Sequence, residues 1–319
     1  MNGYLGIDVG SVSTNLVVIN TDGEVKEKIY LRTKGQPIDV VQKGLKELKA
    51  SIADNVEIKG VGTTGSGRNL TSVVVGADAV KNEITAHAVA SSHIVPDVRT
   101  VLEIGGQDSK ITILRNGIVV DFAMNTVCAA GTGSFLDQQA ARLGIPIEDF
   151  GGMALKSKNK VRIAGRCSVF AESDMIHKQQ MGHNLEDIIA GLCEALVRNY
   201  LNNVGQGKDI LAPVVFQGGV AANEGIKEAF AEALETEIVV PKHHDVMGAI
   251  GAALLAKDQI ENGKGETSFK GWKVTEIEYT PSSFECDGCA NLCEVIEIRM
   301  DGELVSRWGH RCNKWDLAQ

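Results

Sequence analysis

The chain has 319 residues, of which 44% are hydrophobic and 23% are charged, and its formal net charge is -9 at pH 7. This length and hydrophobic content predict a folded protein of two or three domains rather than a disordered one. The acidic balance, without a stripe of lysine or arginine, argues against nucleic acid as a partner. The apolar run 246–256 is too short to span a bilayer and no signal-peptide pattern is visible, so we expect a cytoplasmic protein without a membrane partner.

Hairpin patterns occur twice along the chain. In the first, alternating apolar residues from 3 to 31 turn at 21–23, and a helical pattern follows at 38–52. In the second, residues 100–122 repeat the same order of strand, glycine-bearing polar turn, strand, tight turn and strand. The repeat predicts an α/β fold with two related domains that face a cleft.

The remainder of the chain alternates helical patterns with loops. Apolar residues three and four apart predict helices at 82–94, 134–143, 169–180, 185–202 and 224–234. The polar, glycine-rich stretch 262–271 predicts a linker, and the short module beyond it contains four of the seven cysteines.

Two glycine-bearing turns between strands have the composition of phosphate-binding loops. The first contains Asp8, Gly10, Ser11, Ser13 and Thr14, and the second contains Gly105, Gly106, Gln107, Asp108 and Lys110. Backbone N–H groups in such turns approach a polyphosphate, and a carboxylate at the strand end, here Asp8, faces Mg²⁺. Two such turns facing each other would clamp a triphosphate, whereas one glycine turn alone is weak evidence.

A third nucleotide-binding element follows the apolar strand at 213–217. Gly218, Gly219 and Val220 precede a predicted helix, so an adenine ring would lie against their backbone. With the three elements in this order, the chain resembles the superfamily of sugar kinases, heat-shock chaperones and actin. It resembles more closely the activators of 2-hydroxyacyl-CoA dehydratases and the ATPase subunits of benzoyl-CoA reductases. The segments that carry this resemblance are 6–11, 105–110, 125–135, 165–167 and 218–221, and it covers residues 3 to 256.

The resemblance implies two actin-like, ribonuclease H-like lobes facing a nucleotide cleft, plus a small C-terminal Cys-rich module. We expect lobe I at 1–95, completed by about 245–260, lobe II with cluster-binding helices at 96–244, and a linker and four-cysteine metal module at 261–319. Segments 82–93 and 245–256 look like the family's hinge helices. On them, Glu83 and Asp245 either contact the site or are surface charges.

An odd number of cysteines without an export signal makes metal binding a better explanation than a disulfide framework. Cys128 and Cys167 each precede a predicted helix, whose N-terminus favours thiolate over thiol. The resemblance implies that these two residues from each of two subunits hold one [4Fe-4S] cluster that bridges a homodimer; two core cysteines are the alternative. Cys193, within an amphipathic helix, is assigned to the core.

The resemblance also implies an ATPase coupled to electron transfer in anaerobic metabolism. Hydrolysis of ATP to ADP would drive an electron into an iron-sulfur enzyme, such as a 2-hydroxyacyl-CoA dehydratase or a related reductase, with reduced ferredoxin or flavodoxin as the donor. Hydrolysis requires Mg²⁺, N–H donors and a group that orients water. We predict Asp8 for Mg²⁺, Gln107 or Asp108 for water, and Lys110 for a phosphate, and the last three roles are exchangeable.

The C-terminal cysteines have metal-binding spacing. They are Cys286, Cys289, Cys293 and, after a predicted hairpin of 294–299 and 303–308, Cys312. The spacing predicts one four-thiolate site, which zinc and a second iron-sulfur cluster would fit equally. The short activators lack this module, which weakens the assignment of a dehydratase as the partner and keeps a related reductase with its own clusters open.

Two other functions fit the nucleotide motifs. An actin-fold kinase of a small metabolite would require neither iron nor dimerisation through Cys128 and Cys167. An ATP-switched, chaperone-like binding module would keep its ATPase activity after loss of the cluster. The seven histidines show no metal-binding spacing and are expected on the surface or in packing.

Overall fold

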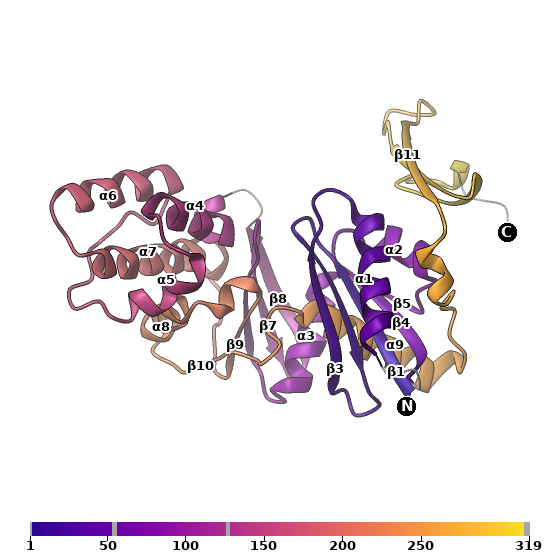
Figure 1. Cartoon of the computed structure of the whole chain (residues 1–319), viewed down its shortest axis with the longest axis horizontal. Helices are drawn as coiled ribbons and strands as arrows, with labels where there is room; N and C mark the ends of the chain where they lie inside the picture. The colour runs from indigo at the N-terminus through magenta and orange to yellow at the C-terminus, as the bar shows by residue number, and fades with distance from the viewer. Residues whose placement is uncertain (1, 53–55, 126–127, 316–319) are drawn as a thin grey trace. The chain divides into compact units, whose positions relative to one another are not determined.

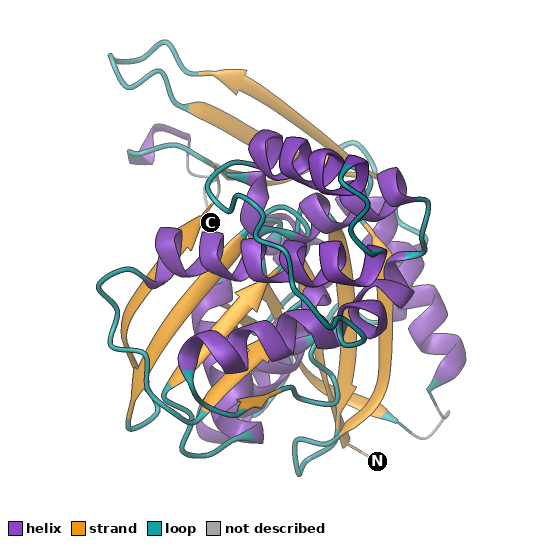
Figure 2. Ribbon diagram, turned by 90° about the vertical axis from the view of Figure 1, so that its left-hand side faces the viewer, coloured by secondary structure: helices purple, strands orange, loops and turns teal. Residues whose placement is uncertain are grey.

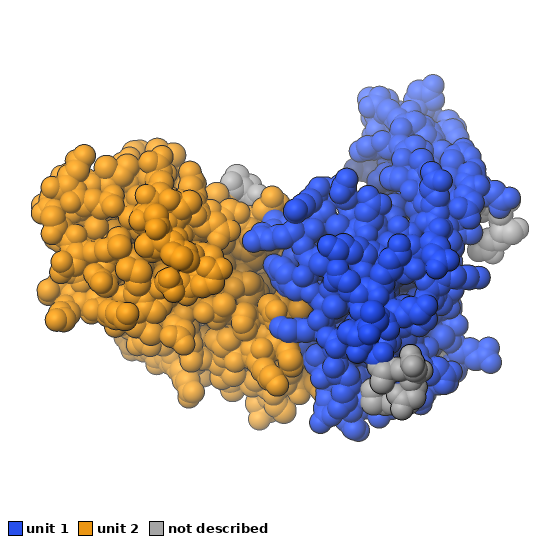
Figure 3. Space-filling view, viewed as in Figure 1, with its two compact units in different colours: residues 1–83, 248–319 blue, residues 84–247 orange. Residues whose placement is uncertain are grey.

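The computed structural model describes residues 2–52, 56–125 and 128–315. The chain divides into two compact units, Met1–Glu83 with Gly248–Gln319, and Ile84–Met247 (Figures 1 and 3). Within these described ranges, no helix combines the length and the apolar character that a membrane span requires.

The first unit is built on a five-stranded sheet in the order β3-β2-β1-β4-β5. The elements are β1 (Asn2–Val9), β2 (Ser13–Ile19), β3 (Val25–Arg32), α1 (Pro37–Ser51), β4 (Glu57–Thr64), α2 (Arg68–Val75), β5 (Ala79–Val80) and the late helix α9 (Met247–Gln259). Strands β1, β2 and β3 are antiparallel, whereas β4 and β5 run parallel to their neighbours.

Alternate residues of β1 pack on opposite sides of this sheet. Leu5 and Ile7 belong to a core formed with Val41, Leu45 and Leu48 of α1. Because side chains alternate along a strand, Gly6 and Asp8 lie on the opposite face, where α9 packs. Both faces of β1 are therefore covered, which explains its nearly continuous burial.

The second unit repeats this topology, with its sheet in the order β10-β9-β6-β7-β8. Its elements are α3 (Glu83–Ile94), β6 (Thr100–Ile104), β7 (Ser109–Arg115), β8 (Ile118–Asn125), α4 (Gly133–Leu143), α5 (Ile147–Ala154), α6 (Ser168–Gln180), α7 (Leu185–Tyr200), β9 (Val214–Gln217), α8 (Glu224–Leu234) and β10 (Ile238–Val239). A layer of these helices lies in front of the strands in Figure 2. The core between them includes Phe216, Tyr200 and Phe230, whose rings meet edge to face at centroid distances of 5.1 and 5.2 Å.

The C-terminal segment adds a three-stranded sheet to the first unit. Strands β11 (Tyr279–Glu285), β12 (Glu294–Met300) and β13 (Glu303–Trp308) are antiparallel. The stretch before them is anchored to the first unit. In the expected linker 262–271, Lys270 N–H donates to Val75 O at 2.9 Å. After the linker, Gln42 Nε2 donates to Val274 O and Ile277 O at 2.8 Å. The module thus continues from a stretch fixed to α1 and α2.

The structure confirms the predicted α/β class, and each unit contains a five-stranded sheet with the same order of strands. The predicted helices and hairpins match observed elements, and their ends differ by at most three residues. Helices α2 and α5 and strand β4 were not predicted, because their apolar patterns are short and glycine interrupts two of them.

Candidate functional site

The first glycine-bearing turn joins β1 to β2 and is closed by its own backbone. Gly10 N–H donates to Ser13 O at 2.9 Å, and Thr33 Oγ1 donates to Gly10 O at 2.9 Å. The Thr14 hydroxyl, predicted to contact nucleotide, is buried and lies 3.0 Å from Thr33 Oγ1. Thr14 therefore braces the turn from inside.

A second loop approaches Asp8 and was missed from the sequence. A Cβ atom on Gly65, whose φ is +83°, would lie 2.5 Å from Asp8 Oδ1, so only glycine fits there. Gly67 N–H donates to Val9 O at 2.9 Å, which fixes this loop to the first turn. In the sequence, the glycines at 65 and 67 follow the segment that forms a strand, and this pattern could have indicated a turn there.

Buried polar atoms without partners flank Asp8. Its cross-strand neighbours are Asn15 on β2 and Thr64 on β4. Asn15 Oδ1 and Thr64 Oγ1 are buried and make no hydrogen bond to any residue that the structure describes. Leaving such an atom unsatisfied costs about 1–3 kcal/mol, so a bound polar group is expected here. Oxygen ligands beside a carboxylate fit hydrated Mg²⁺, which supports the prediction for Asp8.

Helix α9 lies directly on the backbone of β1 and β4. A Cβ atom on Gly6 would lie 1.8 Å from Ala249 O, and one on Gly62 would lie 2.0 Å from Ala252 O. No side chain fits between helix and sheet at these points. The small residues of segment 245–256 therefore allow close packing against β1, the strand that contains Asp8.

The second turn, between β6 and β7, contains a buried ion network. Glu103 Oε1 lies 3.1 Å from Lys110 Nζ, and Glu103 Oε2 lies 2.7 Å from His87 Nδ1. The Lys110 ammonium also contacts Asp108 Oδ2 at 3.0 Å. Burial raises the pKa of Glu103, but the charges of His87 and Lys110 outweigh it and lower that pKa to about 2. Burial lowers the pKa of Lys110, and its two carboxylate partners more than reverse this effect.

Sequence reasoning missed His87 and Glu103 and left His87 among surface or packing residues. His87 is buried on α3 and also contacts Gln217 Nε2, while Gln217 Oε1 accepts a hydrogen bond from Ser91 Oγ at 2.8 Å. Gln217 directly precedes the predicted adenosine loop at 218–220. The network therefore connects α3 with two strands that lead to predicted nucleotide loops.

The predicted adenosine loop, residues 218–220, is held tightly at its first glycine. Gly218, with φ +92°, would place a Cβ atom 2.4 Å from Ile104 O, while its N–H donates to His244 O at 2.8 Å. Gly219 has open space around its Cβ position, and Val220 is buried. The loop thus packs against the end of β6, just before the second turn.

The second turn is bonded directly to the start of α4. Gly133 N–H donates to Gly105 O at 2.8 Å, and Ser134 N–H donates to Gly106 O at 2.9 Å. Ser134 Oγ also donates to Gly106 O. The turn predicted to bind phosphate is therefore continuous, through hydrogen bonds, with the segment that follows Cys128.

The two predicted cluster cysteines each stand at the start of a helical turn. Cys128 precedes a 3₁₀ turn that leads into α4, Cys167 is the N-cap of α6, and both are partly exposed. Asn199 Nδ2 donates to Gly165 O at 2.6 Å and lies 3.9 Å from Cys128 Sγ, so one α7 side chain reaches both cysteine loops. Residues 126 and 127 of the predicted segment 125–135 lie outside the described residues.

These features fit the predicted cluster site, which takes only two thiolates from each chain. Two partly exposed sulfurs at helix starts, with loops joined by Asn199, are suited to an anionic cluster. Cys193, by contrast, is buried, and burial raises the pKa of its thiol to about 12, which confirms its place in the core.

The C-terminal cysteines are distributed around the small sheet. Cys286 N–H donates to Cys293 O at 2.8 Å, and the Trp315 side chain and the Gly288 N–H lower the pKa of the Cys286 thiol. Cys289 and Cys312 are exposed. Among the described residues, no group of three or more histidine, cysteine, aspartate or glutamate side chains is arranged for a metal ion. The four-thiolate site therefore stays a prediction.

Comparison with known proteins decides the family. The model of the BadF/BadG/BcrA/BcrD ATPase family matches residues 5–256. The chain belongs to the BadF/BadG/BcrA/BcrD ATPase family. The matched range ends within α9, so the C-terminal sheet lies outside it.

Relatives of this ATPase family support the same conclusion. The chain is 36% identical over 260 residues to the (R)-2-hydroxyglutaryl-CoA dehydratase activating ATPase of Acidaminococcus fermentans, covering 79% of this chain and 96% of the relative. It is 34% identical over 265 residues to the 2-hydroxyisocaproyl-CoA dehydratase activator of Clostridioides difficile, covering 82% and 97%. Among solved structures, the ADPNP-bound activator of the 2-hydroxyisocaproyl-CoA dehydratase from Clostridium difficile matches with a TM-score of 0.72 at 34% identity, covering 82% of this chain and 96% of that one.

Proposed function

We propose that this member of the ATPase family is an ATP-dependent activator that, as a homodimer, transfers electrons to a partner iron-sulfur enzyme. The observation that carries the proposal is the bonding of Gly105 and Gly106 to Gly133 and Ser134. These hydrogen bonds join the turn that we propose to bind phosphate to helix α4, which follows Cys128, a proposed cluster ligand. A kinase or a chaperone-like module would have no use for this connection to Cys128.

The chain's own residues divide the nucleotide chemistry. Asp8 would hold Mg²⁺ and, with the N–H groups of the first turn, stabilise the charge that develops on the phosphates. In the second unit, Gln107 or Asp108 would orient the attacking water. Gly218 to Val220 would receive the adenine. Lys110 is already bound by two carboxylates, so it would act on phosphate only if nucleotide drew it from Asp108, its more exposed partner.

Cys128 and Cys167 from each of two subunits would hold the [4Fe-4S] cluster. When bound, the cluster would supply reversible one-electron chemistry at low potential. A nucleotide-dependent shift of Gly105 and Gly106 would displace the two carbonyls that hold the start of α4. That displacement would change the exposure and hydrogen bonding of Cys128, which are two determinants of a cluster's potential.

The names of the relatives point to the class of acceptor. Those relatives are activators of 2-hydroxyacyl-CoA dehydratases, so we propose such a dehydratase, or a related reductase, as the acceptor. Reduced ferredoxin or flavodoxin would supply the electron. The C-terminal sheet, outside the family match, would distinguish this chain's acceptor from those of the shorter activators.

The test is to purify the protein without oxygen, measure iron and sulfide per dimer, and record electron paramagnetic resonance after reduction, with and without MgATP. Cys128→Ala and Cys167→Ala are compared with Cys193→Ala, which removes a core thiol of the same unit. The proposal expects about four irons per dimer, loss of iron in the first two variants only, and a signal that changes with nucleotide. Full iron in both cluster variants would contradict it and favour the kinase.

A further inference from the structure

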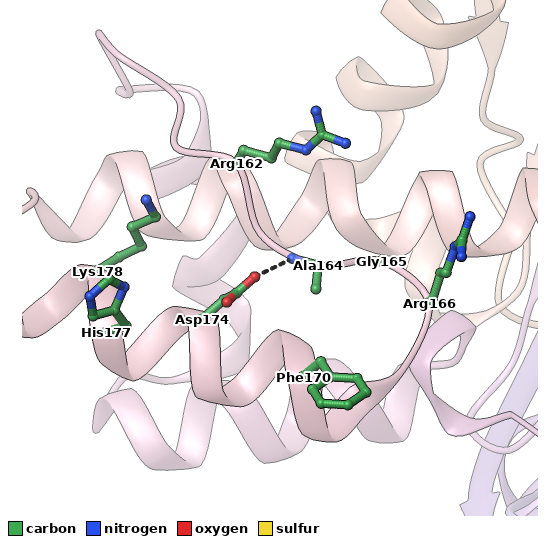
Figure 4. Close-up of a pocket in the computed structure, with 8 residues that line it drawn as sticks. All are labelled: Arg162, Ala164, Gly165, Arg166, Phe170, Asp174, His177 and Lys178. Atoms are coloured by element: carbon green, nitrogen blue, oxygen red, sulfur yellow. Dashed lines mark hydrogen bonds between the residues drawn. The ribbon is translucent and has the colours of Figure 1, made fainter.

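A basic cavity lies beside the cysteine that begins α6. Its volume is about 580 Å³, and its lining consists of Arg162, Ala164, Gly165, Arg166, Phe170, Asp174, His177 and Lys178 (Figure 4). Arg166 immediately precedes Cys167 in the chain, and Phe170 lies on the first turn of the helix that Cys167 caps. The cavity therefore adjoins one of the two proposed cluster ligands.

The cavity has a surplus of positive charge that the chain does not neutralise. Arg162, Arg166 and Lys178 form no ion pair within the described residues, and Figure 4 shows their charged ends extending to the same side of the ribbon. The single carboxylate of the lining, Asp174, is engaged by the backbone, because its Oδ2 accepts a hydrogen bond from Ala164 N–H at 2.9 Å. Three permanent positive charges thus remain available in a chain whose net charge is -9.

Apolar side chains stand next to these charges. In the single chain, Val169 and Phe170 are each 66% exposed, although large hydrophobic side chains are usually covered. An exposed apolar pair with a charged rim is the composition of a protein interface rather than of a site for a small anion alone.

The geometry points to this cavity and its apolar edge as the docking surface for an acidic electron-donor protein. The inference rests on the proposed function, because it assumes a cluster at Cys128 and Cys167. A chain with a net charge of -9 repels an acidic donor at long range, so a local basic surface is needed to steer it. Docking there would bring the donor's redox centre toward Cys167. The donor would lose one electron, the cluster would gain it, and no proton transfer is required.

The test uses the double variant Arg162→Glu/Lys178→Glu in the cluster-loaded dimer. Reduction by a reduced, negatively charged [4Fe-4S] ferredoxin is followed by stopped flow at low salt, and reduction by methyl viologen radical, a small cation, is the reference. We expect ferredoxin to react about tenfold or more slowly, with weaker salt dependence, and methyl viologen to react no more slowly. The matched control, Lys156→Glu/Lys158→Glu, makes the same charge change at exposed residues outside the cavity and should retain the wild-type rate with ferredoxin.

Binding gives a readout that does not depend on the cluster. Calorimetry of oxidised ferredoxin with cluster-free protein should show a Kd about tenfold weaker for the cavity variant than for the wild type or the control. If Arg162→Glu/Lys178→Glu does not fold, Arg162→Gln/Lys178→Gln should show a smaller loss in the same direction.

Three results would overturn the docking surface. The first is that ferredoxin reduces both double variants equally slowly, and the second is that it reduces neither more slowly than the wild type. The third is that the cavity variant is impaired only in electron transfer from the prereduced protein to the acceptor. If the cavity variant has normal ATPase activity and iron content and ferredoxin reduces it at the wild-type rate, only the docking surface is rejected. Retention of iron by Cys128→Ala and Cys167→Ala would reject the proposed function itself.

Discussion

Asp8 and Glu103 occupy equivalent positions in the two sheets, yet their surroundings differ. Each lies near the end of the central strand that leads into a glycine turn. Asp8 has Asn15 and Thr64 as its cross-strand neighbours, whereas Glu103 has Lys110 and Gln217. Asn15 and Thr64 are neutral and have buried oxygens without a hydrogen bond among the described residues. Lys110, by contrast, is a cation that contacts Glu103, and the Gln217 amide contacts Ser91 and His87.

The difference shows that one backbone position serves two purposes. A carboxylate beside unsatisfied polar atoms is suited to an incoming metal ion and nucleotide. A carboxylate neutralised by Lys110 and in contact with His87 is suited to holding a strand, a helix and a turn together. The two turns also connect to different helices. The first is bonded to the loop before α2 through Gly67, and the second to α4, which follows Cys128.

Asp8→Asn is the strongest test of this comparison. Removal of the charge that we propose to hold Mg²⁺ should lower the rate of ATP hydrolysis about 10²–10³-fold with little change in melting temperature. Asp22→Asn, at the opposite end of the same hairpin, should retain wild-type activity in the same phosphate-release assay. Equal rates for Asp8→Asn and wild type would remove Asp8 from the site.

Glu103→Gln should act on stability instead. It leaves the buried Lys110 ammonium with Asp108 alone, so the free energy of unfolding should fall by about 3 kcal/mol, measured by thermal and urea unfolding. Asp108→Asn is the matched control, because the Asp108 side chain is 37% exposed and its pairing with Lys110 is weakened by solvent. If Asp108→Asn lowered the free energy of unfolding more than Glu103→Gln did, Asp108 rather than Glu103 would be the main partner of Lys110.

The low pKa of Glu103 predicts a specific dependence of stability on pH. Because folding lowers this pKa from 4.5 to about 2, the charged form stabilises the protein above pH 4.5, and this contribution is lost as pH falls toward 2. The stability difference between wild type and Glu103→Gln should therefore narrow by about 1 kcal/mol between pH 7 and pH 4. A difference that stays constant over this range would show that Glu103 is not held in its charged form.

Ser134→Ala should have the smallest effect on stability, about 1 kcal/mol or less, because it removes one hydroxyl bond to Gly106 O. It should nevertheless reduce the nucleotide-dependent change in the cluster's paramagnetic resonance signal. Ser66→Ala is its counterpart in the first unit, since Ser66 Oγ donates to Val9 O at 3.3 Å, and it should leave that change intact. If Ser134→Ala and Ser66→Ala changed the nucleotide-dependent signal to the same extent, the start of α4 would not be what couples nucleotide binding to the cluster.

Much of the fold could be predicted because its signals are local. Alternation in 3–31 and 100–122 identified both hairpins, and apolar spacing identified α6, α7 and α8 to within two residues. Short elements such as α2 and α5 escaped, since eight residues contain too few turns to establish a period.

The candidate site was predictable in part for the same reason. Glycine and carboxylate at a strand end, or cysteine before a helix, are patterns within a few residues, so Asp8, Gly105, Cys128 and Cys167 could be proposed directly. The glycines at 65 and 67 indicate a turn, but the closeness of Gly65 to Asp8 could not be predicted, because it depends on the parallel pairing of β1 with β4.

The sequence by itself determined the α/β class, the two glycine turns, the glycine loop at 218–220 and the cysteines at helix starts, because side-chain periodicity and backbone requirements act over neighbouring residues. Only the tertiary structure decided that Lys110 faces Glu103 and Asp108, that His87 joins Glu103 to Gln217, and that Gly105 and Gly106 hold the start of α4. It also decided that Arg162 and Lys178 share a cavity beside Cys167. These contacts join residues that only packing brings together, and their energies depend on burial and on partners that no local pattern contains.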